Sequence, residues 1–226
     1  MIAAPLLAVF RAMGLLMPFP ATLLLPAGFV LMMLTPFLAL DRPARRQMGL
    51  TRPRGAASCW RSVAWGSGMA AFCFFFGWFL YGASPDHWFV SIRNYYQANP
   101  SATGRTPWVL FLIFTGPALI FSPLGEEIFF RGYLQDALEE RFSIRAGTWL
   151  ESLAFGAVHL LHHGIVLAEG EVWLRPVSGP LWFALMTGAG LIFARLRRQS
   201  DSLWPPILAH AAFNLVMNAT IFAILW

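Results

Sequence analysis

Four groups of polar and ionisable residues lie in or beside apolar stretches of this chain. They are Glu126-Glu127 with Arg131, then His159, then His162-His163, and finally His210 with Asn214. Each ionisable side chain costs roughly 2.5–3.5 kcal/mol to insert at depth in a membrane, so these positions call for an explanation. Carboxylates and imidazoles are the side chains that most often act as general acids and bases. Their presence in apolar surroundings indicates an acid–base site inside a helical bundle.

Helical spacing predicts how these groups face one another. Glu127 and Arg131 are four residues apart, so on a helix they are neighbours and can form an ion pair. Glu126 points about 100° away from Glu127 and lies off that face. His210 and Asn214 are also four residues apart and face one cavity together. The pattern leaves one carboxylate neutralised by an arginine and a second one available for chemistry.

Each group taken alone also has a purely structural interpretation. Glu127 and Arg131 could cap the start of a helix at the membrane interface. His210 and Asn214 could bond neighbouring helices, as polar pairs do in bundles. A single buried histidine such as His159 is usually a satisfied core residue. The functional interpretation therefore depends on whether the groups meet in space.

The two adjacent histidines follow His159 by three and four residues. His159 and His163 could ligate a metal from one helix face. The glutamate of a His-Glu-x-x-His arrangement is absent, however. We therefore expect His162 and His163 to be ordinary polar residues near the outer membrane interface.

Depth in the membrane joins three of the groups. We take Gln135, Glu151 and Ser202 as the points where their helices meet the cytoplasmic interface. Three chemistry-bearing side chains lie eight or nine residues from these markers: Glu126, His159 and His210. At 1.5 Å per residue they lie about 12–14 Å below the interface, close to the midplane of a roughly 30 Å core. A carboxylate and two imidazoles are thus expected to converge at one depth.

Composition places this site in a membrane protein. The 226 residues are 58% hydrophobic and 12% charged, with a mean hydropathy of +0.59, whereas an ordinary soluble domain is about 25% charged. A soluble core of this size would expose large apolar patches. The composition excludes a disordered chain, a disulfide scaffold and a typical cytosolic enzyme. It predicts an all-α, polytopic bundle of transmembrane helices.

Six stretches approach the length of about 20 mostly apolar residues that a membrane span needs. They are residues 20–40, 60–82, 107–124, 147–168, 179–196 and 203–225. Residues 1–18 are predicted to form a seventh helix and not a cleaved signal, because Arg11 lies where a signal peptide needs its apolar stretch. With no internal repeat or linker, residues 1–226 are interpreted as a single integral membrane domain.

Arginine clusters predict the orientation of the chain. The formal net charge is +5, and all 16 basic residues are arginine. Eleven of them gather in the segments 41–61, 141–145 and 195–198, which the positive-inside rule places in the cytoplasm. The six spans alternate consistently with this placement and leave the Arg-poor loops 83–106 and 169–178 outside. We expect an integral protein of a bacterial inner membrane, with the Arg-rich loops cytoplasmic.

Three motifs resemble those of the CPBP family, which comprises CAAX-type prenyl endopeptidases and bacteriocin-processing or immunity-type intramembrane proteases. In the family's order they are Glu126-Glu127-x-x-x-Arg131, Phe155-x-x-x-His159 and His210-x-x-x-Asn214. Each motif falls on a separate predicted helix. Residues 105–226 are therefore interpreted as the catalytic core and residues 1–104 as additional N-terminal helices.

The resemblance implies an intramembrane endopeptidase that hydrolyses a peptide bond in a membrane-associated or lipidated substrate. The roles it implies are water activation by Glu126 and His159, oxyanion stabilisation by His210 and Asn214, and support of the site by Glu127 and Arg131. A neutral histidine and an asparagine amide can both donate to an oxyanion, and a low-dielectric cavity strengthens such donors. Hydrolysis also needs a water-filled pocket, which we expect to open toward the cytoplasm.

Other interpretations stay open. One glutamate and two histidines could ligate zinc, but we favour a site without a metal or other cofactor, because asparagine is a rare zinc ligand. A non-catalytic immunity or scaffold protein would keep the polar cluster for packing. A proton-coupled transporter would use it as a relay, although no repeat supports that. The expected partners are the lipid bilayer and a membrane-anchored, prenylated or leader-bearing peptide, with no nucleic acid.

Overall fold

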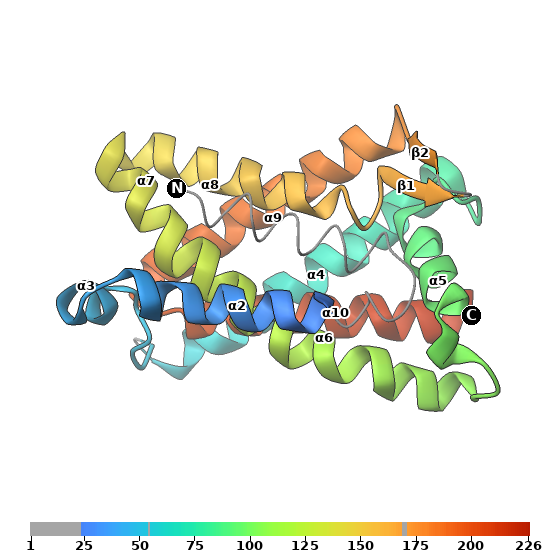
Figure 1. Cartoon of the computed structure of the whole chain (residues 1–226), viewed down its shortest axis with the longest axis horizontal. Helices are drawn as coiled ribbons and strands as arrows, with labels where there is room; N and C mark the ends of the chain where they lie inside the picture. The colour runs from blue at the N-terminus through green and yellow to red at the C-terminus, as the bar shows by residue number, and fades with distance from the viewer. Residues whose placement is uncertain (1–23, 54, 169–170) are drawn as a thin grey trace.

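A computed structural model describes residues 24–53, 55–168 and 171–226 of the chain, and helices dominate them (Figure 1). The helices are α2 (Leu24–Ala39), α3 (Arg42–Gln47), α4 (Ala56–Tyr81), α5 (Trp88–Ala98), α6 (Pro107–Phe129), α7 (Gln135–Arg141), α8 (Ile144–His159), α9 (Ser178–Ser200) and α10 (Trp204–Thr220). Shorter elements are the 3₁₀ turn η2 (Pro100–Ala102), the π-helical turns η3 (Phe130–Leu134) and η4 (Ile221–Leu225), and the strands β1 (Ile165–Ala168) and β2 (Glu171–Leu174). The all-α prediction is correct apart from this single hairpin.

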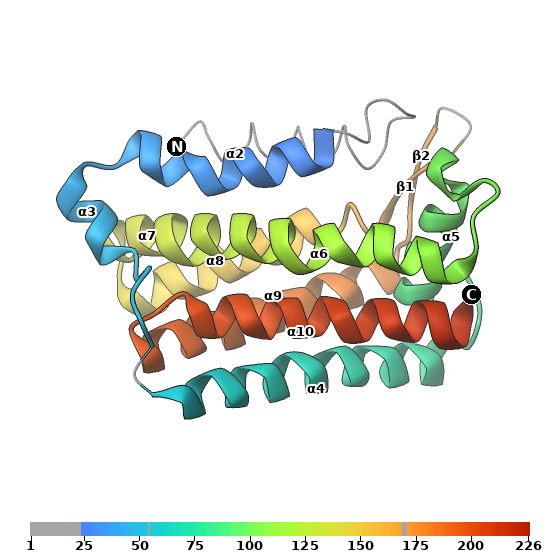
Figure 2. The ribbon, with the colours of Figure 1, turned by 90° about the horizontal axis from the view of Figure 1, so that it is seen from below.

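The long helices run along a common axis, with α10 at their centre. α10 packs against α4 on one side and α6 on the other (Figure 2), and it also contacts α9. α8 packs along α9, and α2 covers α6. At one end of this bundle α5 lies across the helices beside the β-hairpin, while α3 lies at the opposite end (Figure 1).

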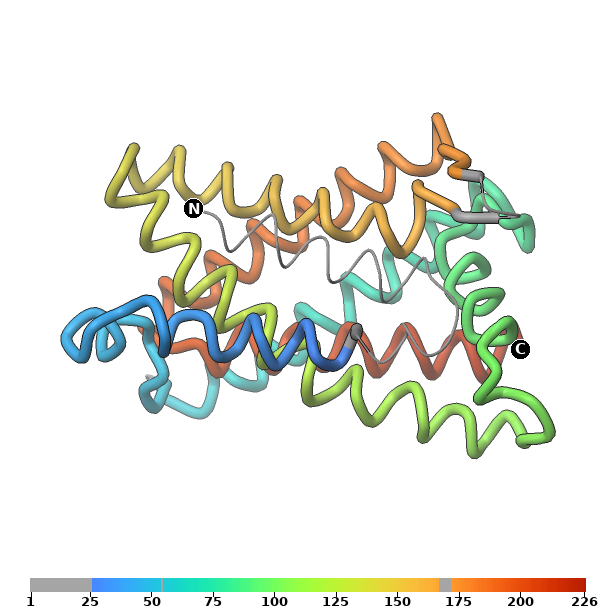
Figure 3. The backbone as a smooth tube through the Cα atoms, in the orientation of Figure 1, coloured from blue at the N-terminus to red at the C-terminus, as the bar shows by residue number. Residues whose placement is uncertain are grey.

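Four helical segments are long and apolar enough to cross a membrane. They are Ala56–Tyr81, Pro107–Arg141, Ser178–Ser200 and Trp204–Leu225. In the segment Pro107–Arg141, α6, η3 and α7 follow one another as one continuous helix (Figure 3). α2 contains a shorter apolar segment, Pro26–Ala39. The described residues therefore give four candidate spans and do not confirm a count of six or seven, and residues 1–18 lie outside the described part.

The expected span over residues 147–168 is wrong in its second half. α8 ends at His159, and Ile165–Ala168 forms strand β1, which pairs antiparallel with β2. Gly164 lies between α8 and β1 with φ +121°. Glycine adopts this backbone conformation without the steric penalty of a side chain. An apolar run by itself does not distinguish a buried helix from a strand, so hydropathy carried the predicted helix too far.

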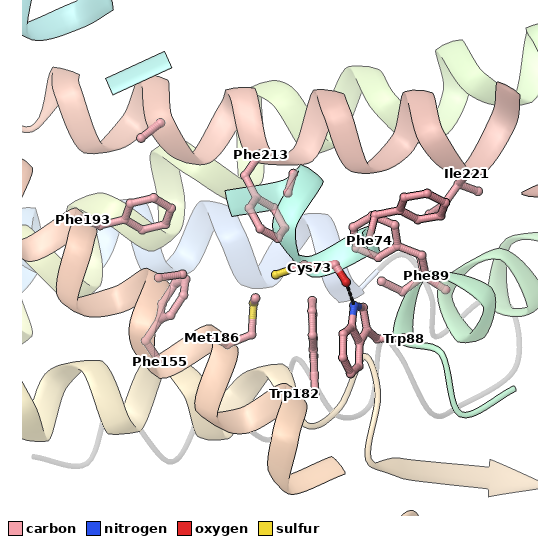
Figure 4. Close-up of a cluster of buried hydrophobic side chains, with 14 of the residues drawn as sticks. Cys73, Phe74, Trp88, Phe89, Phe155, Trp182, Met186, Phe193, Phe213 and Ile221 are labelled. Carbon is pink, nitrogen blue, oxygen red and sulfur yellow. Dashed lines mark hydrogen bonds between the residues drawn. The ribbon is translucent and has the colours of Figure 1, made fainter. Parts of the chain in front are cut away.

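Aromatic packing fills the bundle near α5. Trp88 stacks on Trp182 with ring centroids 5.6 Å apart, and its indole N–H donates to the Cys73 carbonyl at 3.0 Å (Figure 4). On the same helix α4, Gly66 lies where α4 and α10 approach closely. A Cβ at Gly66 would lie 1.9 Å from the Ala209 carbonyl oxygen, so the position of α10 depends on the missing side chain.

Candidate active site

The six side chains singled out by the sequence come from three helices and the turn η3. α6 carries Glu126 and Glu127, and η3, which directly follows α6, carries Arg131. α8 ends at His159, and α10 carries His210 and Asn214. All six residues are buried, with at most 8% of any of them exposed. π-Helical turns are frequent at functional sites, and this one carries the buried guanidinium of Arg131.

Glu127 forms the centre of one half of the site. Its Oε1 lies 3.2 Å from Nη1 of Arg131 and 2.7 Å from Nδ1 of His210. The predicted Glu127–Arg131 ion pair is thereby confirmed. The contact with His210 joins α6 to α10 across 83 residues of sequence. Because a carboxylate accepts hydrogen bonds, this geometry favours a proton on Nδ1 of His210.

Glu126 and His159 form the other half. Oε2 of Glu126 lies 3.8 Å from Nε2 of His159, while Ser122 donates a hydrogen bond to Oε1 at 3.1 Å. Nδ1 of His159 lies 2.7 Å from the Phe155 carbonyl oxygen and donates to it. Nε2 of a neutral His159 is then an acceptor that faces the carboxyl group. A separation of 3.8 Å is too long for a direct hydrogen bond, but both groups can contact one water molecule.

Asn214 lies one helical turn beyond His210 on α10, and both border the same cavity. Its amide nitrogen donates to the Ala118 carbonyl at 2.8 Å. An amide nitrogen carries two hydrogens, so this bond orients the side chain and leaves one donor. The expectation that His210 and Asn214 face one cavity is correct.

Glu151 is a site residue that the sequence reasoning missed. Taken there as a marker of the membrane interface, it is instead fully buried, and its Oε1 lies 3.3 Å from Nε of Arg131. Arg131 therefore lies between two carboxylates, one from α6 and one from α8. The available signal was spacing: Glu151, Phe155 and His159 recur every four residues and share one face of α8.

Aromatic rings enclose the charged groups. Cζ of Arg131 lies 4.0 Å from the centroid of the Phe155 ring and 5.2 Å from that of Phe193. The Phe193 ring also stacks on His210, with centroids 5.4 Å apart. Such contacts favour a cation over the ring face. They add Phe193, on α9, to the residues that hold this site.

A cavity of about 560 Å³ connects the site to one end of the bundle. Its walls include His159, His210 and Asn214, together with residues of α5 and β1. This end is opposite α3 and its arginines (Figure 1). The cavity therefore extends away from the Arg-rich end, toward the segments that the charge rule places outside, and its expected opening toward the cytoplasm stays a prediction.

The two adjacent histidines follow α8, and their expected place near the outer membrane interface stays a prediction. His162 lines the cavity, and its ring lies 5.3 Å from that of His159. His163 is fully buried and lies 2.9 Å from the Ser178 hydroxyl, which donates to Asp86. The segment between α8 and β1 thus places His162 at the cavity and His163 in the interior.

α5 forms one wall of the cavity and is held by polar contacts at both ends. His87 donates from Nε2 to the Phe74 carbonyl, while Nδ1 accepts from the Phe89 N–H at the helix start. Acceptance at Nδ1 requires a neutral imidazole, and burial lowers the pKa of His87. At the other end the Tyr96 hydroxyl donates to Asn218 at 3.0 Å. These bonds fix α5 to α4 and α10.

The buried acids and histidines are also the side chains that could ligate a metal ion. Within residues 24–53, 55–168 and 171–226, no group of three or more His, Cys, Asp or Glu side chains is placed to hold a metal ion. Glu126 and His159 face each other, whereas Nδ1 of His210 is directed at Glu127. The preference for a site without a metal stays a prediction.

The family comparison matches this half of the chain. Residues 106–216 fit the family described as Rce1-like, type II CAAX prenyl endopeptidase. The chain belongs to this family. The matched segment contains all three motifs, from Glu126 to Asn214, and it identifies the protein as a CAAX-type intramembrane endopeptidase in the general sense. Comparison with curated proteins and with solved structures gave no match.

Proposed function

We propose that the protein hydrolyses a peptide bond of a prenylated or otherwise membrane-anchored substrate, using Glu126 and His159 to activate water. The observation that carries this proposal is the 3.8 Å separation of the two groups, beside a cavity also bordered by His210 and Asn214. Positioned acid–base groups of this kind contribute about 10²–10⁴-fold to a rate.

The proposed reaction uses Glu126 as the base. A water molecule donates one hydrogen bond to Nε2 of His159 and gives its other proton to the Glu126 carboxylate. Its oxygen attacks the carbonyl carbon and forms a tetrahedral intermediate. When the C–N bond breaks, Glu126 returns the proton to the leaving nitrogen. Protons and charges balance without a further reactant.

His210 and Asn214 are proposed to stabilise the oxyanion. Because Nδ1 of His210 is directed at Glu127, a neutral His210 with its proton there would present only a lone pair at Nε2. A His210 with its proton on Nδ1 donates from Nε2 only as the imidazolium, whereas the neutral donor expected from the sequence needs the proton on Nε2. We therefore assign the donor to the imidazolium form, with Glu127 as its counter-ion and Asn214 as the second donor.

The test uses the protein reconstituted in liposomes with a farnesylated peptide ending in Cys-Val-Ile-Met, a tail of the CAAX type. Glu126→Gln is expected to lower the cleavage rate at least 100-fold. Glu140→Gln makes the same chemical change at an exposed position of α7 and is the matched control. Equal cleavage rates for Glu126→Gln and the wild type would refute the mechanism, whereas no cleavage by the wild type would favour the immunity or scaffold alternative.

The metal-free form of the mechanism has its own test. We expect a chelator such as 1,10-phenanthroline to leave the cleavage rate within twofold of the untreated protein. Loss of activity that is restored by added zinc would instead support the metal-dependent alternative, in which Glu126 and His159 would act as ligands.

A further inference from the structure

The cavity reaches the edge of strand β1. Both Ile165 and Val166 line it. Consecutive residues of a strand point to opposite faces of the sheet, so a cavity bordered by both lies along the edge of the strand. β2 occupies the other edge, and the described side chains of β2 do not line the cavity.

The hydrogen-bond register shows which backbone groups point to that edge. The Arg175 N–H donates to the Gly164 carbonyl, which makes these two residues a hydrogen-bonded pair. Pairing alternates along an antiparallel ladder, and Ile165 lies opposite Leu174. Ile165 and Leu167 therefore direct their backbone groups away from β2. The Ile165 N–H is consistent with this register, because it donates to the Leu160 carbonyl at 3.0 Å and not to β2. The remaining groups at this edge are the Ile165 carbonyl and the N–H and carbonyl of Leu167.

An exposed strand edge is a template for another strand, and open edges do not occur against lipid hydrocarbon. An extended peptide has the same need, because its backbone groups require partners in an apolar cavity. β1 begins six residues after His159, and both border the same cavity. An edge that leads to the water-activating pair fits the main chain of a peptide substrate.

We propose that the edge of β1 at Ile165–Leu167 binds the substrate as an added antiparallel or parallel strand, through main-chain hydrogen bonds. This inference rests on the proposed function, because the occupant is the peptide to be cleaved. Recognition by the main chain gives affinity with little dependence on side chains. The peptide must therefore be extended at the residues that pair with β1.

Proline substitutions at two opposed positions provide the test. Leu167 lies opposite Val172 in the register, and the N–H groups of both point away from the ladder between the strands. Leu167→Pro removes the N–H on the cavity side, and Val172→Pro removes the equivalent N–H on the far side. Proline is tolerated at such edge positions. Thermal unfolding of the two variants checks that both fold equally well.

Binding is measured in a Glu126→Gln background, so that it does not depend on hydrolysis. The probe is the farnesylated Cys-Val-Ile-Met peptide labelled with a fluorophore. We expect Leu167→Pro to weaken its Kd about tenfold, the effect of one hydrogen bond in a low-dielectric site, and Val172→Pro to change it less than twofold. N-methylation of one backbone nitrogen in the probe is expected to weaken binding similarly.

The inference is overturned if both proline variants bind the probe equally and every N-methylated probe binds like the parent. It is also overturned if Leu167→Pro weakens binding of farnesol alone to the same extent, since a lipid would then be the occupant. Cleavage by the otherwise wild-type protein is assayed separately. Cleavage with unchanged probe binding leaves the endopeptidase function standing and removes only the strand pairing.

Discussion

The buried charge cluster around Arg131 gives the sharpest prediction. Glu151→Gln removes one of the two carboxylates that flank Arg131, which lie 3.2 and 3.3 Å from it, and all three side chains are fully buried. Removing one partner of a buried ion pair costs about 3–5 kcal/mol. Because Arg131 keeps Glu127, we expect a loss near the lower limit, about 3 kcal/mol in the free energy of unfolding.

The measurement is a denaturant titration of detergent-solubilised protein followed by tryptophan fluorescence. Asp136→Asn is the control, because it removes the carboxylate of a partly exposed ion pair with Arg197. Such pairs contribute about 0–1 kcal/mol, so the control is expected to lose far less stability than Glu151→Gln.

A double-mutant cycle separates the ion pair from general packing. Once Arg131→Met has removed the guanidinium, the further change Glu151→Gln is expected to cost little or to restore stability, since it removes a carboxylate that has lost its partner. Activity is not expected to recover, because Glu127 would have lost Arg131. Additive losses in the double variant, or a loss for Glu151→Gln no larger than for Asp136→Asn, would refute the assignment of Glu151 to the site.

Two further predictions concern the elements around the site. Gly66→Ala is expected to cost about 1–3 kcal/mol by overpacking α4 against α10, whereas Gly68→Ala, where a Cβ meets nothing within 4 Å, is expected to be neutral or stabilising; equal unfolding free energies would contradict this. Burial lowers the pKa of His87 from its ordinary value of 6.5, so the unfolded chain binds more protons and stability falls as pH decreases below about 6.5. His87→Asn keeps a capping acceptor without the titration, and its melting temperature is expected to change less between pH 8 and pH 5 than that of the wild type; identical changes would exclude His87 as a source.

Sequence reasoning worked best within single helices. The four-residue spacing of Glu127 and Arg131 predicted their ion pair, and the pair is present. The spacing of His210 and Asn214 predicted a shared cavity, and both border one. In each case the 3.6-residue period of the helix fixes the relation between the side chains. These neighbours can therefore be predicted without knowledge of the tertiary packing.

Contacts between helices were harder to predict from the sequence. The sequence did not predict that His210 pairs with Glu127 while His159 faces Glu126. Which carboxylate meets which imidazole depends on the rotation and offset of α6, α8 and α10, and spacing along one helix carries no information on either. Spacing places Glu151 on the face of α8 that carries His159, but its pairing with Arg131, which lies on another element, depends on packing.

By itself the sequence determined the class of this protein: an apolar helical bundle with acidic and imidazole groups in three ordered motifs. Composition fixes the solvent that the chain prefers, and helical periodicity fixes local neighbours. The tertiary structure decided the pairing of those groups, the end of α8 at His159, and the cavity that runs along β1. These depend on how separate helices pack and on a hairpin whose residues are as apolar as a helix, so no local pattern specifies them.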